Sequence, residues 1–258
     1  MNKKFLIIIP ARYASTRFPA KPLAILAGKS VIQRVYSQVE DVADMVVVAT
    51  DNNLIAQEVE RFGGNVVMTS EKHRSGTDRC CEAMELVGGD YDVIINVQGD
   101  EPFIQKSQIE TIKKCFQQEN TQIATLVKPF TKTDGFDAVK NPNSPKVVIN
   151  NENEAIYFSR SVIPFVRGVD YGDEWMNHNI FYKHIGIYAY KSHVLKEITQ
   201  LPQSSLELAE SLEQLRWIQN GYKIKVGFTD VETIGIDTPE DLKKAESYIK
   251  DHPKLTIL

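Results

Sequence analysis

The sequence predicts a three-layer α/β fold, in which helices cover both faces of a mostly parallel sheet. Short β-branched runs alternate with helical patterns between residues 5 and 87, which is typical of parallel strands joined by helices. The runs Val46–Val48 and Val93–Ile95 are continuously apolar, as strands are when helices cover both of their faces. With 42% hydrophobic and 25% charged residues, the composition is that of a soluble globular protein with a sizeable core.

The predicted elements follow one another in a regular order. Phe5–Ile9 is the first strand, and Val31–Val39 is the first helix, for which Ser30 and Gln33 provide a capping signal. Next come the strand Met45–Ala49, the helix Leu54–Phe62, the strand Asn65–Met68, the helix Arg79–Val87 and the central strand Tyr91–Val97. The last helix starts at Thr238–Asp241, where a capping hydroxyl precedes a proline.

Two later segments break this rhythm. Lys146–Phe158 contains two β-runs on either side of the polar turn Asn150–Glu154, which predicts a hairpin. Val166–Asn179 is polar and lacks a period, so we interpret it as a loop that moves over a site. We therefore expect one domain over residues 1–258, with a small inserted hairpin region and a subregion at about 130–220.

Charge and hydropathy exclude several classes of protein. The formal net charge of −4 argues against a nucleic-acid-binding surface, because phosphate backbones are bound by basic faces. The apolar run Phe5–Ile9 ends at Pro10, and no run approaches the roughly 20 residues that cross a bilayer. We expect a soluble, cytoplasmic protein without membrane insertion. The 3 cysteines lack C-x-x-C spacing, so we expect them to pack in the core.

The strongest candidate binding site is the loop Pro10–Pro22, directly after the first predicted strand. Ligands of open α/β sheets gather at the carboxyl ends of the strands, where guanidinium and ammonium groups bind phosphate oxygens. Prolines in the loop lower the cost of holding like charges together. The loop therefore predicts a polyphosphate site, with a solvated basic turn as the alternative. The loop offers Arg12, Arg17, Lys21 and two hydroxyl groups as candidate ligands.

Two aspartates are candidate metal ligands. Asp100 follows the central strand, and Gly99 lets the backbone bend before it, which suits a carboxylate that holds Mg²⁺ against phosphate oxygens. The alternative for Asp100 is an Asx turn. Thr238 and Asp241 can cap the last helix by themselves, so Asp237 is left as a second metal ligand or as a helix-start acid favoured by the dipole.

One further segment and a group of three separate residues supply candidate nucleotide and sugar contacts. In His73–Arg79, hydroxyls and amides can read a base or ribose while Arg79 reaches a phosphate; simple helix capping is the alternative. Arg160, His184 and Gln214 would together suit a carboxylated polyol. Taken singly, each of the three is more often structural, and a histidine such as His184 is often a satisfied, partly buried one.

As a set, these residues resemble one family, the CMP-KDO synthetases or 3-deoxy-manno-octulosonate (KDO) cytidylyltransferases. The resemblance covers nearly the whole chain and rests on Pro10–Pro22, His73–Arg79, Asn96–Pro102, Lys146–Val148, Tyr157–Arg160, His184–Tyr190, Glu213–Arg216 and Gly235–Leu242. It implies a fold of the nucleotide-diphospho-sugar transferase type, a homodimer and dependence on Mg²⁺. It also implies the formation of CMP-KDO and pyrophosphate from CTP and KDO, for lipopolysaccharide synthesis.

The resemblance also implies roles for single residues. It implies that Arg12 and Lys21 bind phosphate and take part in catalysis, with Ser15 and Arg17 in the same loop, and that Arg79 and Gln98 bind the nucleotide. It implies that Asp100 and Asp237 bind the metal and take part in catalysis. The sugar-binding residues that it implies are Arg160, His184, Tyr188, Glu213 and Gln214. The chain departs from the family pattern at Ala20 and Ala189, where glycine is usual. If position 20 needs a positive φ, alanine there costs of order 1 kcal/mol, and the loop can take a slightly different path.

The mechanism that follows is an in-line attack of the anomeric hydroxyl of the sugar on the α-phosphorus of CTP, with pyrophosphate leaving. Three alternatives stand beside it. A related transferase would use another acidic sugar, such as a sialic acid or an amino-substituted KDO. A glycosyltransferase would need a D-x-D metal site after a strand, whereas Asp90–Asp92 precedes its strand. A nucleotide-binding regulator would carry out no reaction.

Overall fold

The computed structural model describes residues 3–14, 17–231 and 234–251. The chain forms two compact units, of which the first comprises 1–110, 189–199 and 233–258, and the second 111–188 and 200–232. Strand β10 (Tyr182–Lys191) and helix α4 (Lys106–Cys115) contribute residues to both units. The single domain with a subregion at about 130–220 that the sequence predicts stays a prediction.

Buried parallel strands form the centre of the first unit. Strand β1 (Phe5–Ala11) lies between β4 (Met45–Thr50) and β6 (Val93–Asn96) and runs parallel to both. Beyond them, β5 (Val66–Met68) pairs with β4, and β10 neighbours β6. The side chains of β1 and its neighbours are almost entirely inaccessible to water, because helices cover both faces of these strands. The predicted central strands are confirmed.

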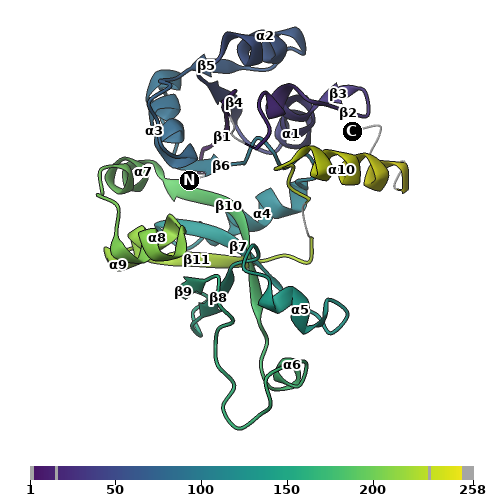
Figure 1. The fold of residues 1–258 in the computed structure, drawn as a ribbon. Coiled ribbons are helices and arrows are strands. Elements are labelled where there is room, and N and C mark those ends of the chain that lie inside the picture. The colour runs from purple at the N-terminus through teal and green to yellow at the C-terminus, as the bar shows by residue number, and fades with distance from the viewer. Residues whose placement is uncertain (1–2, 15–16, 232–233, 252–258) are drawn as a thin grey trace. The chain divides into compact units, whose positions relative to one another are not determined.

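Helices cover this sheet on two sides. Figure 1 shows α3 and α7 on one face of the strands and α1 and α2 on the other. The bounds of these helices are Val31–Val39 for α1, Asn53–Arg61 for α2, Gly76–Val87 for α3 and Ser192–Thr199 for α7. The predicted three-layer, mostly parallel α/β fold is therefore confirmed. One boundary is corrected: α3 begins three residues before Arg79, because the Ser75 hydroxyl accepts a hydrogen bond from the Asp78 amide.

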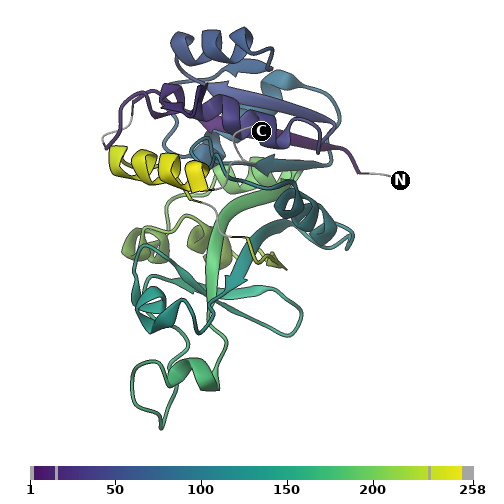
Figure 2. The same ribbon diagram turned by 90° about the vertical axis from the view of Figure 1, so that its right-hand side faces the viewer.

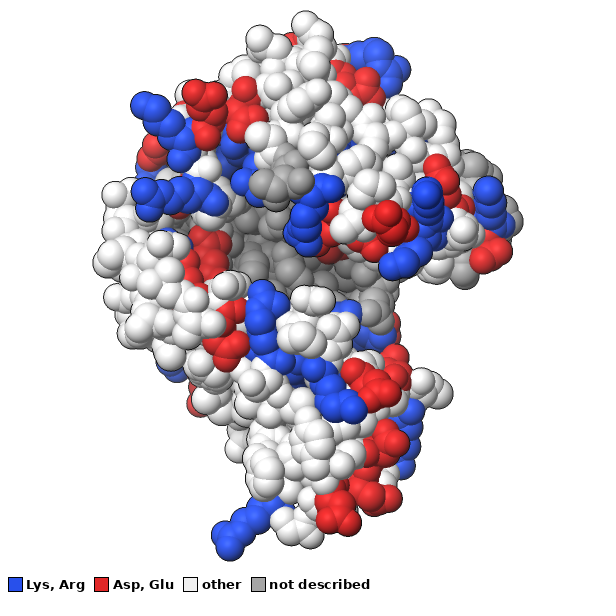
Figure 3. All heavy atoms as spheres, viewed as in Figure 1, with Lys and Arg blue, Asp and Glu red and all other residues white. Residues whose placement is uncertain are grey.

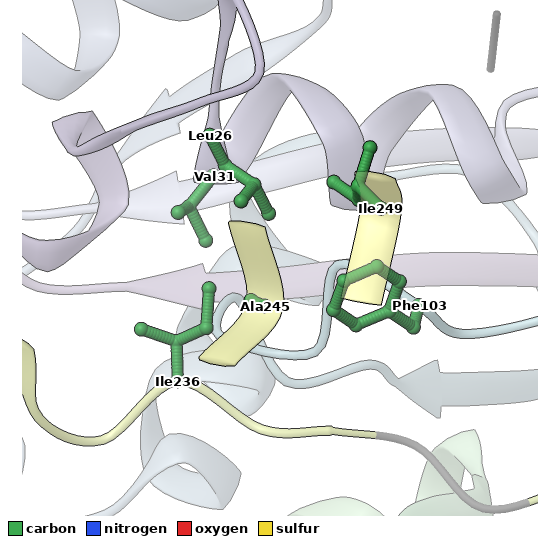
Figure 4. Close-up of a cluster of buried hydrophobic side chains, with 6 residues drawn as sticks. All are labelled: Leu26, Val31, Phe103, Ile236, Ala245 and Ile249. Atoms are coloured by element: carbon green, nitrogen blue, oxygen red, sulfur yellow. The ribbon is translucent and has the colours of Figure 1, made fainter. Parts of the chain in front are cut away.

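A hydrophobic cluster attaches the last helix to the first unit. Helix α10 (Pro239–Asp251) packs beside the small hairpin of β2 (Ile25–Leu26) and β3 (Lys29–Ser30). Figure 4 shows the buried side chains of this cluster, which are Leu26, Val31, Phe103, Ile236, Ala245 and Ile249. The Ile236 amide also donates a 2.9 Å hydrogen bond to the Asp100 carbonyl. Packing and this hydrogen bond together fix the turn before α10 beside the turn after β6.

The second unit contains both parallel and antiparallel strands. Strands β7 (Ile123–Pro129) and β11 (Ile224–Phe228) are parallel, whereas β8 (Lys146–Ile149) pairs in antiparallel fashion with β9 (Ala155–Ser159) and with β10. The predicted hairpin is thereby confirmed. The helices of this unit are α5 (Gly135–Lys140), α6 (Trp175–His178), α8 (Ser205–Glu210) and α9 (Gln214–Gln219).

The segment between β9 and β10 projects from the strands as a long arm, which is visible from two sides in Figures 1 and 2. The sequence predicted a loop over Val166–Asn179, but the arm contains the one-turn helix α6. The reason is Trp175, which is buried against Phe136 and Phe181 and donates from Nε1 to the Val169 carbonyl. Movement of this segment over a site stays a prediction.

On the face shown in Figure 3, basic and acidic side chains are interspersed. In the part of the chain that the structure describes, no helix is long and apolar enough to cross a membrane. Cys80 and Cys115 are buried as expected, while Cys81 is partly exposed, because it lies on α3 at a position between the buried face and solvent.

The loop after β1 makes a left-handed turn at Ala20. Its backbone has φ 56° and ψ 21°, and hydrogen bonds from the Ala20 amide to the Tyr13 carbonyl and from the Leu23 amide to the Ala20 carbonyl hold this conformation. Position 20 therefore has the positive φ at which alanine costs free energy of folding relative to glycine, since a Cβ atom crowds the carbonyl oxygen in the left-handed region.

Replacing Ala20 with glycine is expected to raise the thermal unfolding midpoint by up to about 4 °C. The gain is about 1 kcal/mol of relieved backbone strain, reduced by the greater freedom of glycine in the unfolded chain, and 1 kcal/mol corresponds to about 2–4 °C in a chain of this size. Ala24→Gly is the control, because Ala24 is extended and should only lose stability. A midpoint that falls equally in both variants would contradict the prediction.

Candidate active site

A pocket of about 280 Å³ opens at the carboxyl ends of β1 and β6 in the first unit. Its walls come from the loop after β1, the segment before α3, the turn after β6 and the turn before α10. Predicted phosphate, nucleotide and metal ligands lie together in these walls: Arg12, Arg17, Lys21, Arg79, Gln98, Asp100 and Asp237. Ser15 lies outside the described residues. The sequence thus predicted the place of the pocket, because the ends of parallel strands meet at one edge of a sheet.

Gly99 allows two walls of the pocket to approach each other. A Cβ atom at this position would lie 2.8 Å from the backbone oxygen of Pro10, which is too short for a contact with rigid backbone. Only glycine therefore lets the turn after β6 pass this close to the end of β1. Gly99 brings Asp100 to the same end of the sheet as the basic loop.

Lys21 joins the two candidate metal carboxylates. Its ammonium lies 2.5 Å from Oδ2 of Asp100 and 3.3 Å from Oδ1 of Asp237. The lysine side chain is only 12% exposed, because it starts a short helical turn, Lys21–Leu23, whose Pro22 is buried. Arg17 approaches Asp237 from the solvent side, at 3.2 Å. Both carboxylates therefore reach a single cation.

Asp237 is free for this contact because its neighbours cap the helix. The Thr238 hydroxyl accepts from the Asp241 amide at 3.2 Å, and the Asp241 carboxylate accepts from the Thr238 amide at 3.1 Å. This reciprocal arrangement satisfies the helix start. The prediction that Thr238 and Asp241 cap α10 without help from Asp237 is confirmed.

The oxygen atoms of this site fit a magnesium ion that arrives with a triphosphate. Within the described ranges, no group of three or more histidine, cysteine or acidic side chains converges on a metal position. Mg²⁺ does not require such a group, because it keeps several waters and is bound by one or two carboxylates together with substrate phosphates. Asp100 and Asp237 are a pair of this kind.

Arg79 is engaged by the protein itself. Its guanidinium is buried and donates to the Asp51 carboxylate and the Thr69 hydroxyl, both at 2.6 Å. Asp51 follows β4 and Thr69 follows β5, so Arg79 connects the ends of two strands. Arg79 borders the pocket, and its direct contact with a nucleotide stays a prediction. Capping of α3, the alternative left open for this segment, is confirmed for Ser75.

The predicted sugar-binding residues lie in the second unit, and several of them form one cluster. His184 and Tyr188 are four residues apart on β10 and point the same way, with 5.3 Å between ring centroids. Tyr188 contacts Trp217 of α9 edge to face at 5.0 Å. Glu213 and Gln214 stand at the start of α9, and Gln214 Nε2 is buried without a hydrogen bond to any described residue. A buried amide donor of this kind is costly unless a ligand or water accepts from it.

Arg160 is held differently from the rest of the set. Its guanidinium donates to the carbonyl oxygens of Glu210, Pro142 and Ser211 at 2.7, 2.9 and 3.3 Å. In addition, the Glu210 carboxylate accepts from the Arg160 amide at 2.9 Å. Through these contacts Arg160 connects the end of β9 to the end of α8. Its role in sugar binding stays a prediction.

Three residues that hold Arg160 or His184 were given no role from the sequence. Glu210 anchors Arg160 and also accepts from the Ser159 hydroxyl at 2.6 Å. Lys146 is fully buried and donates to the Arg160 carbonyl at 2.6 Å, and burial lowers its pKa to about 8. Thr125 contacts His184 Nε2 at 3.1 Å. Only Lys146 carried a signal, as a lysine at the start of a β-run that is otherwise apolar.

His184 is neutral in the folded protein. Burial lowers its pKa to about 3. The Thr125 hydroxyl donates to the Ile187 carbonyl at 2.8 Å, so its oxygen can accept the proton of His184 Nε2. The alternative of a satisfied, partly buried histidine therefore describes its hydrogen bonding, and this neutral ring also borders Tyr188.

Comparison with known proteins gives a consistent result. A family model described as cytidylyltransferase matches residues 6–224. The 3-deoxy-manno-octulosonate cytidylyltransferase of Parabacteroides distasonis is 67% identical over 95% of this chain and 98% of its own length. The enzyme of the same name from Bacteroides thetaiotaomicron is 65% identical over 96% and 99%. A solved structure of CMP:2-keto-3-deoxy-manno-octonic acid synthetase complexed with CTP has a TM-score of 0.88 and 39% identity, over 97% of this chain and 100% of that one.

The fold, the pocket and these comparisons define the chain as a nucleotidyltransferase. The class excludes the glycosyltransferase and the non-catalytic regulator as alternatives. More narrowly, the chain belongs to the 3-deoxy-manno-octulosonate cytidylyltransferase family, whose curated members it matches over nearly their full length.

The neutral His184 predicts that part of the stability is lost in acid. Between about pH 6.5 and pH 3, the unfolded chain binds a proton at this ring and the folded chain does not, so stability falls as the pH falls through this range. His184→Gln should lower the midpoint of thermal unfolding at pH 7. In this variant the midpoint should also decline less between pH 7 and pH 5 than it does in wild type. The exposed His178 gives the control, His178→Gln. Identical pH slopes for wild type and His184→Gln would contradict this assignment.

Proposed function

We propose that the chain transfers the cytidylyl group of CTP to 3-deoxy-manno-octulosonate, giving CMP-KDO and pyrophosphate. The observation that carries this proposal is the convergence of Lys21, Asp100 and Asp237 in a pocket that also contains Arg12 and Arg17. Such a pocket offers both cationic groups for a triphosphate and oxygen ligands for a divalent cation. The identity of CTP and of the sugar acid is supported by the names of the relatives and of the CTP-bound structure.

The reaction needs no nucleophilic side chain of the protein. The anomeric oxygen of the sugar attacks the α-phosphorus of CTP, and the bond to the pyrophosphate oxygen breaks on the opposite side. Negative charge then grows on the departing pyrophosphate. Arg12, Arg17 and Lys21 border the pocket, and we assign to them the neutralisation of this charge.

We propose that Asp100 and Asp237 hold Mg²⁺ together with oxygens of the nucleotide. When bound, Mg²⁺ supplies charge neutralisation at the phosphates and polarises the attacking hydroxyl. Lys21 has a flexible four-carbon stem, so its ammonium can leave the carboxylates and turn to the triphosphate. Lys21 would thus exchange one set of anionic partners for another.

We assign recognition of the sugar acid to the second unit. Gln214 Nε2 is a buried donor without a partner among the described side chains and backbone, and the neighbouring groups of Glu213 and Tyr188 can exchange hydrogen bonds with hydroxyls. His184 would accept a hydrogen bond at Nδ1, because burial keeps the ring neutral and its single proton is donated from Nε2 to Thr125. Arg160 would act mainly by holding the segment after β9 in place.

We also propose a homodimer and a cytoplasmic location, with the product serving lipopolysaccharide synthesis. Support for the homodimer comes from the arm, where Phe165, Tyr171 and Ile180 are large, apolar and at least 60% exposed. Exposed apolar side chains that gather in one place often mark an interface. A second copy of the chain is the partner we expect there.

The function is tested by a matrix of nucleoside triphosphates against acidic sugars, with pyrophosphate release as the readout. Wild type should release pyrophosphate with CTP and KDO in the presence of Mg²⁺. Asp100→Asn should lose turnover by about 100-fold or more, because metal-held charge stabilisation is lost, yet still bind CTP in calorimetry. Asp90→Asn, a change at an exposed residue of the same unit, serves as control. Product from another pair of substrates but none from CTP and KDO would replace the proposed substrates while keeping the reaction class.

The role of Lys21 is tested by metal binding without nucleotide. In Lys21→Met, the two carboxylates lose their ammonium, so Mn²⁺ should bind the free protein about tenfold more tightly than it binds wild type, as measured by electron paramagnetic resonance. Turnover with CTP and KDO should fall in the same variant. Lys106→Met, which removes an exposed ion pair with Asp41, is the control. Equal Mn²⁺ affinity in wild type and Lys21→Met would refute the exchange of partners proposed for this lysine.

A further inference from the structure

Two side chains of helix α3 reach back to the segment that precedes the helix. Arg79 and Glu82 are three residues apart, so they lie on the same face of α3. Arg79 contacts Thr69, and Glu82 accepts a 2.8 Å hydrogen bond from the Ser70 amide. The same carboxylate oxygen of Glu82 contacts Nε2 of His73. The segment from Thr69 to His73 is therefore attached to the helix at three points.

This segment forms one wall of the pocket. His73, Arg74 and Ser75 border the cavity, whereas Glu82 is not among the described residues that do so. Any effect of Glu82 on a bound nucleotide must therefore pass through His73 and the backbone at Ser70. Residues 71–75 belong to no helix or strand, so side-chain contacts have a large share in fixing their conformation.

The carboxylate of Glu82 is suited to holding His73 and the Ser70 amide in place. Burial raises its pKa, but hydrogen bonds from His73 and from the Ser70 amide outweigh burial and leave the pKa below its usual value. An ionised carboxylate makes stronger hydrogen bonds than a neutral acceptor. The side chain of Glu82 therefore holds both contacts as an anion.

The position of this wall distinguishes it from the phosphate-binding walls. Arg12, Arg17 and Lys21 come from the loop after β1, and Asp100 comes from the turn after β6. The segment before α3 supplies the Ser75 hydroxyl, the His73 imidazole and backbone amides, which can bind a base or ribose, together with the guanidinium of Arg74. The two halves of a nucleotide can thus be held by separate parts of the pocket.

We propose that Glu82 is a positioning residue for the nucleoside half of CTP, acting through His73 and the Ser70 amide. This inference rests on the proposed function for the identity of the nucleotide. Loss of the Glu82 carboxylate should weaken the binding of CTP. It should leave the binding of a free polyphosphate chain intact, because Glu82 does not hold the loop after β1.

The test compares Glu82→Ala, Glu82→Gln and the control Glu85→Ala. Glu85 lies on the same helix, is exposed, and pairs with Lys196 at 3.3 Å. Glu82→Ala should raise KM for CTP about tenfold, since two hydrogen bonds to the wall are lost, with kcat and KM for KDO within about twofold. Glu82→Gln keeps an acceptor for Ser70 and should raise KM for CTP about threefold. Inhibition by inorganic tripolyphosphate, which carries no base or ribose, should be unchanged in all three variants.

Further measurements separate positioning from general damage. His73→Asn should reproduce the KM effect, and the double variant with Glu82→Ala should show much less than the sum of the two effects. If Glu82→Ala leaves KM for CTP unchanged, or weakens the binding of tripolyphosphate as much as the binding of CTP, the proposal is wrong. Should Glu82→Ala fail to fold by circular dichroism, the same comparison is decided with Glu82→Gln.

Failure of the role proposed for Glu82 can be distinguished from failure of the proposed function. If wild type releases no pyrophosphate from CTP and KDO, the proposed function fails, and calorimetric binding of CTP and tripolyphosphate to the same variants still decides the role of Glu82. If wild type is active and the variants bind CTP normally, only the positioning role is lost.

Discussion

The pocket depends on the contact of the Lys21 ammonium with the carboxylates of Asp100 and Asp237. This interaction joins three segments that are far apart in the sequence: the loop after β1, the turn after β6 and the turn before α10. Two like charges at close range repel, so the carboxylates can share this place only with a cation between them. The backbone geometry that brings them together comes from apolar packing and from Gly99.

Much of the first unit could be predicted because its signals are local. Continuous apolar runs such as Val93–Ile95 identify strands covered on both faces, and Ser30 and Thr238 identify helix starts through their hydroxyls. The bounds of the two units could not be predicted from local signals, since they depend on contacts between residues distant in the chain. Helix α6 was missed for the same reason, because Trp175 forms it by packing against Phe136 and Phe181.

The candidate site was predictable in its location more than in its contacts. Loops at the ends of neighbouring parallel strands must meet, so Arg12, Lys21 and Asp100 could be placed together from the sequence alone. The partner that a long side chain selects depends on tertiary structure. Arg79 pairs with Asp51 and Arg160 with backbone carbonyls, although the sequence made both of them candidates for ligand binding. Glu82 and Glu210 had no local signal, because their function lies in holding other residues.

The reciprocal cap of α10 has a consequence for variation of the site. Thr238 and Asp241 cap the start of the helix between themselves, so the Asp237 side chain enters the pocket without serving as a cap. Chemistry and folding are thus assigned to adjacent residues instead of to one. A chain organised in this way can alter or lose the acid at position 237 during evolution and still retain the helix that presents it.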